Sequence, residues 1–459
     1  MYILGISCYY HDASAALLRD GKIVAAAEEE RFTRKKHDTA FPINAIQWCL
    51  KSQHISIKDI DYIGFYEKPI LKLERVLSQH IDMFPFSMKT FLSAMPFWIN
   101  EKLRVPRTIK KKLKYKKGVL FIEHHLAHAA STFLVSPFKK AAIVTVDGVG
   151  EWTTTTYGLG NDKEITLIKE IRFPHSIGLL YSTITAYLGF SVNNSEYKTM
   201  GLSAYGNMDK KTNSYYQKLL SIIDLKEDGS YHMDMDYFVY HYRDRMPSKK
   251  LCDLLGGPVR KPDSQVTQRH QDIAAALQLV TEEILTKILN HAHKETGCSA
   301  LVFSGGVALN SVFNGRILKN TPFKELWMQP NASDGGTSVG VASYIYHTLL
   351  GHERNFLQDS AYLGPRFTKE EIRQFLDEHH IVYHQFKNQK ELLDNVTTLI
   401  FENNVIGWFQ EGMEWGPRAL GARSILANPC NPKAKELLND KVKHREKFRP
   451  FAPVVCLDD

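Results

Sequence analysis

MYILGISCYYHDASAALLRDGKIVAAA, residues 1–27, opens the chain with the pattern that decides its fold. Short runs of apolar and β-branched residues alternate there with polar turns, which is typical of strands joined in a meander. The predicted strands are residues 2–7, 15–18 and 22–27. A polar loop that contains His11 and Asp12 joins the first two strands, and an Asp20-Gly21 turn joins the last two.

The same layout returns further along the chain, beginning at Ala141. Its predicted strands are residues 142–146, 153–158 and 164–171. In each copy an aspartate, Asp12 or Asp147, follows the first strand. A repeated meander of this kind is typical of duplicated α/β folds, such as the actin-like and sugar-kinase class. The sequence therefore predicts an α/β fold with two related halves.

Regular segments continue through the chain and divide it near residues 351–364. Apolar residues at three- and four-residue spacing predict a long helix over residues 270–293. After a stretch of Gly, His, Pro and mixed charges, a second unit is predicted. Its expected elements are helices 369–379, 389–403 and 432–443 and strands 381–386, 405–409 and 424–427. The predicted domains are residues 1–355 and 360–459, the second with an incomplete fold.

The composition is that of an ordinary globular protein, with 459 residues, 44% of them hydrophobic and 24% charged. No apolar run approaches the roughly 20 residues that a membrane span needs, and the first residues lack the layout of a signal peptide. We therefore expect a cytoplasmic protein without a membrane partner. The six cysteines lie far apart with no Cys-x-x-Cys pair, so we expect reduced packing residues rather than disulfides or a thiolate zinc site.

The net charge of +8 is distributed unevenly. Residues 102–117 contain nine Lys or Arg and no acidic residue. Such a segment is either a solvated surface or a patch that meets nucleic acid or another acidic surface. No aromatic or motif signature of a nucleic-acid-binding module accompanies it, so we expect a solvated surface.

The segment 123–128, Glu-His-His-Leu-Ala-His, carries the sharpest chemical signal in the chain. If a helix starts here, as the alanines favour, His124 and His128 project from one face, the geometry of paired histidines that bind a metal. Asp147 and Asp334 follow predicted strands and are the expected carboxylate partners. Two His and two Asp suit Fe(II), Zn(II) or Mn(II). A structural pair of histidines is the alternative, and the sequence leaves both open.

Two glycine-rich turns join strands to helices in the second half of the first domain. One is Ser304-Gly305-Gly306, with Asn310 beyond it, and the other is Gly335-Gly336 after Asp334. Backbone amides at such turns can approach a phosphate at a helix N-terminus, where the helix dipole favours an anion. A tight turn is the alternative for either one. Two such turns in one domain with acidic strand-end loops favour nucleotide binding.

Arginines gather with glycines late in the chain. Residues 414–424 include Arg418 and Arg423, and Arg449 follows downstream. A guanidinium group can hold two phosphate or carboxylate oxygens at once, so an anion site is predicted. Surface arginines on a loop are the alternative.

These segments resemble the O-carbamoyltransferases of antibiotic and nodulation-factor biosynthesis. The matching stretches run in order through nearly the whole chain: residues 5–7, 11–15, 28–37, 124–129, 146–148, 197–206, 304–310, 412–424 and 448–453. Together they are specific to the family, but they do not identify the acceptor.

The resemblance implies a duplicated actin-like domain (ASKHA, Kae-like) over residues 1–355, followed by an incomplete YrdC-like α/β domain over residues 360–459. In the family, the YrdC-like part converts carbamoyl phosphate and ATP into carbamoyl-adenylate. The actin-like part then transfers the carbamoyl group to a hydroxyl of a small-molecule acceptor. Because carbamate is a poor electrophile, its attachment to AMP supplies a good leaving group. The relatives carry roughly a hundred further residues that complete the second domain.

The resemblance also implies roles, carried over by position. His124, His128, Asp147 and Asp334 are the expected metal ligands, with Fe(II) favoured and Zn(II) or Mn(II) compatible. His11 and Asp12 are expected near the acceptor hydroxyl, as base or as orienting group. Ser304, Gly305, Gly306 and Asn310 match the adenosine-side loop. Arg418, Arg423 and Arg449 are expected to hold carbamoyl phosphate or the triphosphate, with Mg²⁺ accompanying ATP.

Two other functions are compatible with the same residues. A transferase of threonylcarbamoyl groups to tRNA would use the basic segment 102–117, but the YrdC-like stretch argues against it. A nucleotide-binding regulatory protein without catalysis would retain the fold, but it would not need both the metal ligands and the arginine loop. We therefore expect a small-molecule acceptor and no nucleic-acid partner. A homodimer is compatible with this interpretation.

Overall fold

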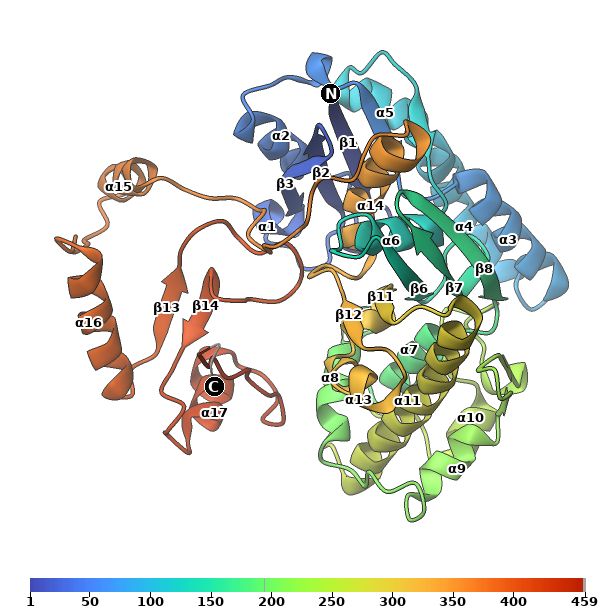
Figure 1. The fold of residues 1–459 in the computed structure, drawn as a ribbon. Helices are drawn as coiled ribbons and strands as arrows, with labels where there is room; N and C mark the ends of the chain where they lie inside the picture. The colour runs from blue at the N-terminus through green and yellow to red at the C-terminus, as the bar shows by residue number, and fades with distance from the viewer. Residues whose placement is uncertain (194, 457–459) are drawn as a thin grey trace. The chain divides into compact units, whose positions relative to one another are not determined.

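The computed structural model describes residues 1–193 and 195–456 and contains two compact units, Met1–Asp359 and Ser360–Asp459 (Figure 1). Unit 1 contains two five-stranded sheets covered by helices. Unit 2 contains a two-stranded sheet with short helical segments. The division between the units lies in the Gly- and Pro-containing stretch after the last helix of unit 1.

The two large sheets of unit 1 are built in the same way. The first has the order β3-β2-β1-β4-β5, with β1 (Tyr2–Ser7), β2 (Ser14–Arg19), β3 (Lys22–Glu28), β4 (Tyr62–Phe65) and β5 (Val119–Phe121). The second has the order β12-β11-β6-β7-β8, with β6 (Lys140–Val146), β7 (Thr153–Asn161), β8 (Glu164–Arg172), β11 (Ala300–Ser304) and β12 (Glu325–Trp327).

Strand directions match between the two sheets as well. In each sheet the first three strands form an antiparallel meander, β1-β2-β3 or β6-β7-β8. Two further strands then add in parallel on the other side of the first strand, β4 and β5 or β11 and β12. This repeated topology confirms the predicted duplicated actin-like α/β domain.

Helices of unit 1 connect these strands. They are α1 (Glu30–Thr33), α2 (Ile43–Ser52), α3 (Pro69–Asp82), α4 (Met88–Asn100), α5 (Val105–Leu113), α6 (His124–Phe133), α7 (Ile177–Tyr187), α8 (Glu196–Ser203), α9 (Ser214–Leu220), α10 (Lys249–Leu254), α11 (Gln268–Thr296), α12 (Ser311–Asn314), α13 (Ile317–Asn320) and α14 (Thr337–Ser343). The predicted long helix is α11, which begins two residues earlier and ends three residues later than expected. It ends at Gly297, whose left-handed backbone (φ 62°) terminates the helix.

The short helix α14 lies between the first sheet and α6. Its backbone approaches the sheet so closely that a Cβ at Gly5 would lie 1.8 Å from the carbonyl oxygen of Ser338. On the α6 side, a Cβ at Gly340 would lie 1.9 Å from the carbonyl oxygen of Ala127. Glycine at these two positions permits the approach, because any side chain there would force the backbones apart. The two halves of unit 1 are therefore joined through α6 and α14.

Apolar side chains fill the space between α6 and the second sheet. The buried residues of this cluster are Ala129, Ala130, Phe133, Leu134, Ala141, Ile143, Ala300 and Val302. The bulky Phe133 ring also lies where a Cβ at Gly160 would be, 2.5 Å away. The face of α6 opposite the histidines is thus anchored in a close-packed core, which fixes the orientation of the helix.

Unit 2 consists of α15 (Lys369–Glu378), α16 (Gln389–Phe401), the antiparallel strands β13 (Ile406–Phe409) and β14 (Arg423–Leu426), and α17 (Ala434–Leu437) followed by a π-helical turn at Leu438–Val442. The predicted strand at residues 381–386 was wrong, because this segment is irregular. Val382 is 97% exposed, so the apolar pattern of the segment is not matched by burial against a sheet within unit 2.

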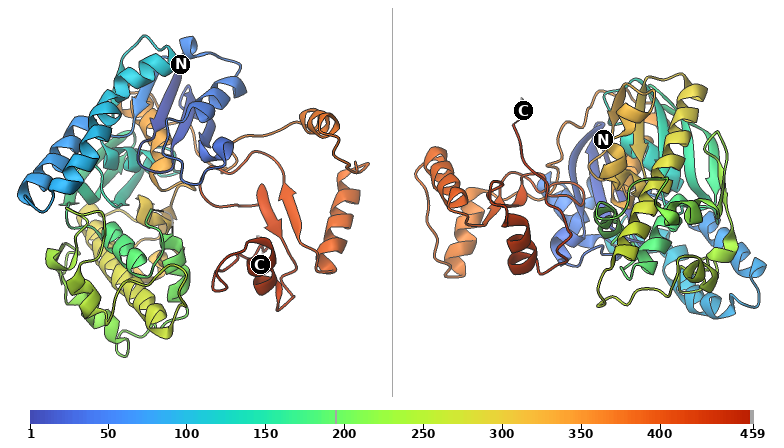
Figure 2. Two further views of the ribbon diagram at one scale, coloured as in Figure 1. Left: turned by 180° about the vertical axis from the view of Figure 1, so that it is seen from behind. Right: turned by 90° about the horizontal axis from the view of Figure 1, so that it is seen from below.

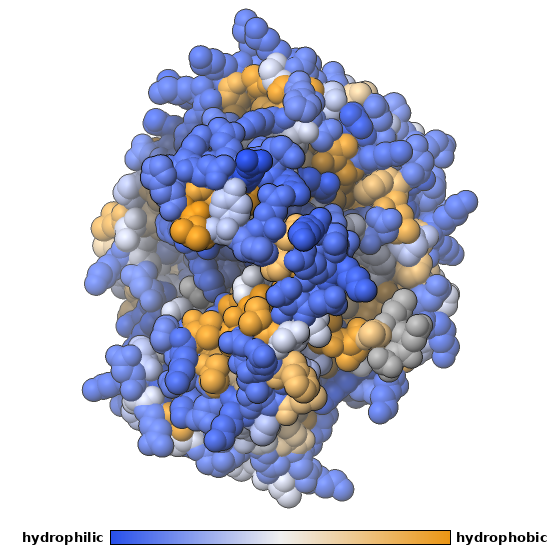
Figure 3. Space-filling model, turned by 90° about the vertical axis from the view of Figure 1, so that its left-hand side faces the viewer, coloured by the Kyte–Doolittle hydropathy of each residue, from blue (hydrophilic) through white to orange (hydrophobic). Residues whose placement is uncertain are grey.

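Among the described residues, no helix is both long enough and apolar enough to cross a membrane. On the face shown in Figure 3, hydrophilic residues predominate and apolar residues form separate patches.

Candidate metal centre

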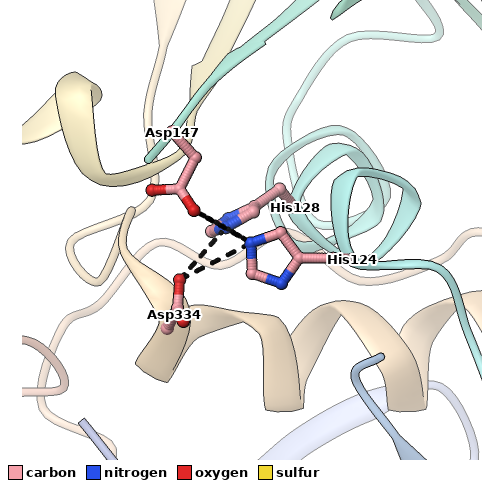
Figure 4. Close-up of side chains that lie close together, drawn as sticks. All are labelled: His124, His128, Asp147 and Asp334. Atoms are coloured by element: carbon pink, nitrogen blue, oxygen red, sulfur yellow. Dashed lines mark hydrogen bonds and ion pairs between the residues drawn. The ribbon is translucent and has the colours of Figure 1, made fainter. Parts of the chain in front are cut away.

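Two histidines and two aspartates from separate segments of unit 1 meet in its interior (Figure 4). His124 and His128 project from α6, Asp147 follows β6, and Asp334 starts a turn of 3-10 helix at Asp334–Gly336. The His124 Nε2 atom lies 3.1 Å from His128 Nε2 and 2.9 Å from Asp147 Oδ2. Asp334 Oδ1 lies 3.7 Å from His124 Nε2 and 3.5 Å from His128 Nε2. All four residues predicted as metal ligands therefore lie in one cluster.

The start of α6 is held in place by a carboxylate from another segment. Glu151 accepts hydrogen bonds from the backbone N–H of His124 at 3.1 and 3.3 Å and from the backbone N–H of Lys68 at 2.7 Å. A carboxylate at this position satisfies an N–H that has no partner within the helix and interacts favourably with the helix dipole. The Tyr66 ring packs edge-on against the His124 ring at 5.5 Å. These contacts fix the first histidine before any ligand binds.

Asp147 is oriented by the turn that follows β11. Its Oδ1 accepts a hydrogen bond of 2.9 Å from the backbone N–H of Gly306, which leaves Oδ2 directed at the histidines. A Cβ at Gly306 would lie 2.8 Å from Asp147 Oδ1, and Gly305 has a left-handed backbone with φ 95°. Glycines are needed at both positions for the turn to approach the carboxylate.

The four ligand atoms fit around one cation. Ligand atoms about 2.1 Å from a shared metal lie about 3.0–3.4 Å apart when the bonds meet at roughly 90–110°. The four atoms lie within 4.8 Å of one another, and the five separations that involve a histidine nitrogen run from 2.9 to 3.8 Å. Both carboxylate oxygens of Asp334 are buried and have no hydrogen-bond partner among the described residues. A buried carboxylate without donors is unfavourable, and a cation supplies the missing partner. The residues present therefore fit a divalent metal ion.

Burial and ion pairing oppose each other in the cluster. Burial lowers the pKa of His128, but its contacts with Asp147 and Asp334 outweigh burial and raise the pKa to about 9. Burial raises the pKa of Asp147, yet His124 and His128 hold it well below its usual value. The pKa of Asp334 is lowered too, since His11 and His124 outweigh its burial. The raised pKa of His128 means that, without a metal, its imidazole holds a proton at neutral pH, which a metal must displace.

His11 faces this cluster from the loop after β1. Asp12 lies between two imidazoles: its Oδ2 is 2.9 Å from His11 Nδ1, and its Oδ1 is 2.7 Å from His37 Nδ1. His11 Nε2 lies 3.9 Å from Asp334 Oδ2. Of the two predicted catalytic residues, His11 is thus directed toward the centre and Asp12 holds it. Asp12 and His37 both have left-handed backbones, with φ of 53° and 52°, which are uncommon for residues other than glycine.

Sequence reasoning assigned no role to His37. Its backbone N–H donates to Glu30 at 2.8 Å, and its ring contacts Asp12 across 25 residues of chain. The only signal in the sequence was its place at the end of the matching stretch 28–37. Glu151 was missed as well, because a carboxylate that caps a helix from a distant loop leaves no local pattern.

The residues predicted for nucleotide binding lie in two places near the cluster. Asn310 is buried; its amide exchanges hydrogen bonds with Gln278 at 2.9 and 3.1 Å and accepts another from the backbone N–H of Phe313. A Cβ at Gly335 would lie 2.6 Å from the Asn331 side chain, and one at Gly336 would lie 1.8 Å from the Asn331 carbonyl oxygen. Packing contacts alone are enough to explain why Asn310, Gly335 and Gly336 occupy these positions. Their role in nucleotide binding stays a prediction.

The three predicted arginines lie in unit 2. Arg423 Nε is 3.0 Å from a carboxylate oxygen of the buried Glu414, and the Arg423 guanidinium also donates to the carbonyl oxygens of Gly416 and Arg418. Arg449 forms an ion pair with Glu446 at 3.3 Å. Arg423 and Arg449 are therefore held by carboxylates, while the Arg418 residue is exposed.

Comparison with known families identifies the group to which the chain is related. The family profile described as carbamoyltransferase N-terminus matches residues 2–343. The chain belongs to the carbamoyltransferase family. A second profile, described as carbamoyltransferase C-terminus, matches residues 397–459. The resemblance seen in the sequence is confirmed, which makes the chain a member of a family of transferases that move carbamoyl groups.

The chain is also similar to several individual proteins. An uncharacterized protein of Synechocystis sp. is 46% identical over 471 residues, covering 100% of this chain and 76% of the relative. The nodulation protein NolNO of Sinorhizobium fredii is 33% identical over 461 residues, covering 98% of this chain. The chain spans 63% of the length of that nodulation protein. The crystal structure of T. kodakarensis HypF aligns at 12% identity with a TM-score of 0.41, covering 76% of this chain and 48% of that one.

Proposed function

We propose that this carbamoyltransferase family member is an ATP-dependent O-carbamoyltransferase that acts on a hydroxyl of a small-molecule acceptor. The observation that carries the proposal is the buried cluster of two histidines and two aspartates, with His11 oriented toward it, in a chain of this family. A cluster of this kind is suited to hold an anionic phosphate ester through a metal while a nearby imidazole meets the acceptor.

The reaction is proposed in two stages. In the first, carbamoyl phosphate loses its phosphate to water, and an oxygen of the resulting carbamate attacks the α-phosphorus of ATP. Pyrophosphate leaves, and the product is carbamoyl-adenylate. In the second, the acceptor hydroxyl oxygen attacks the carbamoyl carbon, the bond to the AMP oxygen breaks, and the hydroxyl proton is released. The adenylate is needed because AMP is a far better leaving group than a carbamate oxygen.

In this proposal His124, His128, Asp147 and Asp334 hold a divalent metal, with Fe(II) favoured and Zn(II) or Mn(II) compatible. When bound, the metal supplies positive charge that offsets the charge of the adenylate phosphate. Mg²⁺ accompanies ATP in the first stage. Ser304, Gly305, Gly306, Asn310, Gly335 and Gly336 are the residues proposed on the nucleotide side.

His11 is proposed to meet the acceptor hydroxyl, with Asp12 and His37 as positioning residues. Burial lowers the pKa of His11, but Asp334 and Asp12 outweigh burial and raise it to about 10 in the metal-free cluster. A cation beside Asp334 offsets the carboxylate charge and so favours the neutral imidazole, which is the form that accepts a proton. The Asp12 contact at His11 Nδ1 leaves Nε2 as the nitrogen directed at the centre.

Unit 2 is proposed to be part of a YrdC-like domain that forms the adenylate, with Arg418, Arg423 and Arg449 holding carbamoyl phosphate or the triphosphate. Support comes from the match of residues 397–459 to the carbamoyltransferase C-terminus and from the anion-binding geometry of guanidinium groups. The buried Glu414 beside Arg423 holds that guanidinium in one orientation.

The first stage is tested without knowing the acceptor. The purified full chain is mixed with ATP, Mg²⁺ and carbamoyl phosphate, and carbamoyl-adenylate and pyrophosphate are measured by mass spectrometry and a coupled assay. We expect both products in equal amounts, and their loss in the Arg423→Ala variant. A metal-loaded sample that binds ATP but forms no adenylate contradicts the proposal and favours a nucleotide-binding regulatory protein.

A further inference from the structure

The helix α3 exposes two isoleucines on an outer face that also carries Glu74, and it buries charged residues together with Val76 on the inner face. Lys72 and Arg75 are buried on its inner face. Ile70 and Ile81 are 76% and 73% exposed. A helix on a globular domain normally turns its apolar residues inward, because burial of apolar surface is the main favourable contribution to folding. The outer face of α3 therefore exposes more apolar side-chain surface than is usual for a surface helix, beside one acidic residue, Glu74.

The next helix, α4, continues this surface. Met88, Leu92, Met95 and Ile99 follow one another at steps of four, three and four residues, so they form one stripe along the helix. Met88, Leu92 and Ile99 are 47%, 64% and 54% exposed. The turn between the two helices adds Phe84 and Phe86, which are 64% and 66% exposed. An exposed apolar surface of this continuity marks an interaction site.

The helix that follows, α5, is basic on its exposed side. Arg104, Arg107, Lys111 and Lys114 are exposed and lie at steps of three, four and three residues, again one stripe. Among the described residues, none of these four bases has a carboxylate oxygen within the 4.0 Å of an ion pair. Figures 1 and 2 show that α3, α4 and α5 lie along one edge of unit 1. The helices that carry the apolar and the basic stripes are thus neighbours.

We propose that this edge, the α3–α4 hairpin with the basic face of α5, docks on the surface of an anionic lipid membrane. Exposed aromatic and aliphatic side chains enter the boundary of head groups and acyl chains, while clustered bases are attracted to anionic head groups. This departs from two expectations, that residues 102–117 form a solvated surface and that the protein has no membrane partner. It concerns attachment to one face of a membrane and not a span.

Two other occupants fit the edge less well. A symmetric contact with a second copy of the chain covers the apolar stripes, but it doubles the positive charge at the interface and supplies no separate acidic surface to the bases of α5. Duplex nucleic acid is attracted to the bases through its phosphates, but these phosphate contacts make no use of the apolar stripe that includes Phe84, Phe86 and Leu92. An anionic membrane is the partner that uses both surfaces, so the observations favour it.

The test is sedimentation of the full chain with vesicles of phosphatidylcholine alone and of phosphatidylcholine with phosphatidylserine. We expect binding to the anionic vesicles that weakens as salt is added. Arg107→Gln, Lys111→Gln and Lys114→Gln together should lower the partition coefficient roughly a hundredfold, since each base contributes about fivefold. A matched control, Lys294→Gln, Lys319→Gln and Lys324→Gln, removes the same charge from exposed positions elsewhere in unit 1 and should leave binding unchanged.

The apolar part is tested by Phe84→Ser with Phe86→Ser, which should lower binding to both kinds of vesicle by more than tenfold. Ile168→Ser with Leu318→Ser is the control, because these residues are 43% and 48% exposed outside the hairpin. Unchanged circular dichroism and metal content show that each variant is folded. Absence of vesicle binding by the wild type overturns the proposal. So does a dimer that the Phe84 and Phe86 changes dissociate, or salt-sensitive binding to duplex oligonucleotide without binding to vesicles.

Discussion

Two clusters of buried charged residues in unit 1 can be compared, and they differ in whether the chain itself supplies hydrogen-bond partners for the buried carboxylate. Glu67 is fully buried, and each of its oxygens contacts a buried ammonium group, Lys102 at 2.8 Å and Lys72 at 2.5 Å. Burial raises the pKa of Glu67, but the two lysines outweigh it and lower the pKa to about 2. Asp334 is equally buried, yet neither of its oxygens has a hydrogen-bond donor among the described residues.

The difference separates a structural cluster from a binding cluster. A buried charge is tolerated when partners surround it, and the Glu67 cluster contains those partners within the chain. In the histidine–aspartate cluster, each histidine nitrogen lies 2.9 to 3.8 Å from the other ligand atoms, a spacing too wide for a full set of hydrogen bonds but suited to a shared cation. Perturbed pKa values occur in both, so they do not identify the site alone. What identifies the site is that the Asp334 oxygens have imidazole nitrogens only at 3.5 to 3.9 Å and no hydrogen bond among the described residues.

The largest effect is expected from breaking the complete cluster. Glu67→Gln leaves two buried ammonium groups without a carboxylate, which should lower the free energy of unfolding by about 3–5 kcal/mol. The change is measured by urea unfolding. Glu123→Gln is the control, because Glu123 pairs with Lys68 at 2.8 Å on the surface and should contribute less than about 1 kcal/mol. Equal losses in the two variants would remove the distinction between the clusters.

Metal addition should act on the other cluster alone. At a free metal concentration about 100 times the dissociation constant, the free energy of unfolding of the wild type should rise by about 2.7 kcal/mol. Asp334→Asn should abolish this rise, whereas Glu67→Gln should keep it on a lower baseline. Thermal unfolding of chelator-treated protein with and without Fe(II) measures both. A rise that survives Asp334→Asn would place the metal elsewhere.

The two clusters should also differ in pH dependence. His128 has a raised pKa of about 9 in the metal-free protein, so below that pH a metal displaces a proton from it. Metal affinity should therefore fall about tenfold for each unit of pH lowered between about pH 8 and pH 6, which is about 1.4 kcal/mol per unit.

The Glu67 cluster responds in a different range. Because the folded-state pKa of Glu67 is depressed to about 2, its contribution to stability is present above the usual carboxylate pKa and is lost as the pH falls toward 2. Titration calorimetry measures metal affinity between about pH 6 and pH 8, and acid unfolding measures stability near pH 2. The two experiments therefore test the two pH ranges separately. Metal affinity that is constant over the neutral range would contradict the assignment of His128.

The smallest effect is expected at the turn that orients Asp147. Gly306→Ala places a Cβ 2.8 Å from Asp147 Oδ1 and should weaken metal affinity about tenfold without unfolding the protein. Gly315→Ala is the control, since its nearest neighbour is the Ser311 carbonyl oxygen at 3.6 Å. The two variants are compared by competition with a metal-binding dye. Identical affinities would show that the turn does not position the ligand.

Much of the fold was predictable from local pattern. The meander at residues 1–27 and its repeat after Ala141 indicate both sheets, since strand periodicity and turn residues are local signals. The helical spacing of His124 and His128 is local too. The strand predicted at residues 381–386 was wrong, because a short apolar run without helical spacing does not reveal whether a sheet is there to receive it.

The site was predictable only in part. Asp147 and Asp334 were named because each follows a predicted strand, and the structure brings them to the same centre. The contacts that hold the ligands were not predictable: Glu151 reaches the start of α6, and His37 reaches Asp12, through tertiary contacts that leave no trace in spacing. The packing of Asn310 on Gln278 is hidden from the sequence for the same reason.

The most direct test of the account is the metal content of protein reconstituted with Fe(II) under anaerobic conditions and freed of excess metal, measured by mass spectrometry of the ions. We expect about one metal ion per chain in the wild type and in Glu67→Gln, and almost none in His128→Ala, which should also lose carbamoyl transfer. Unchanged metal content in His128→Ala would contradict the central claim that the histidine–aspartate cluster is the metal centre.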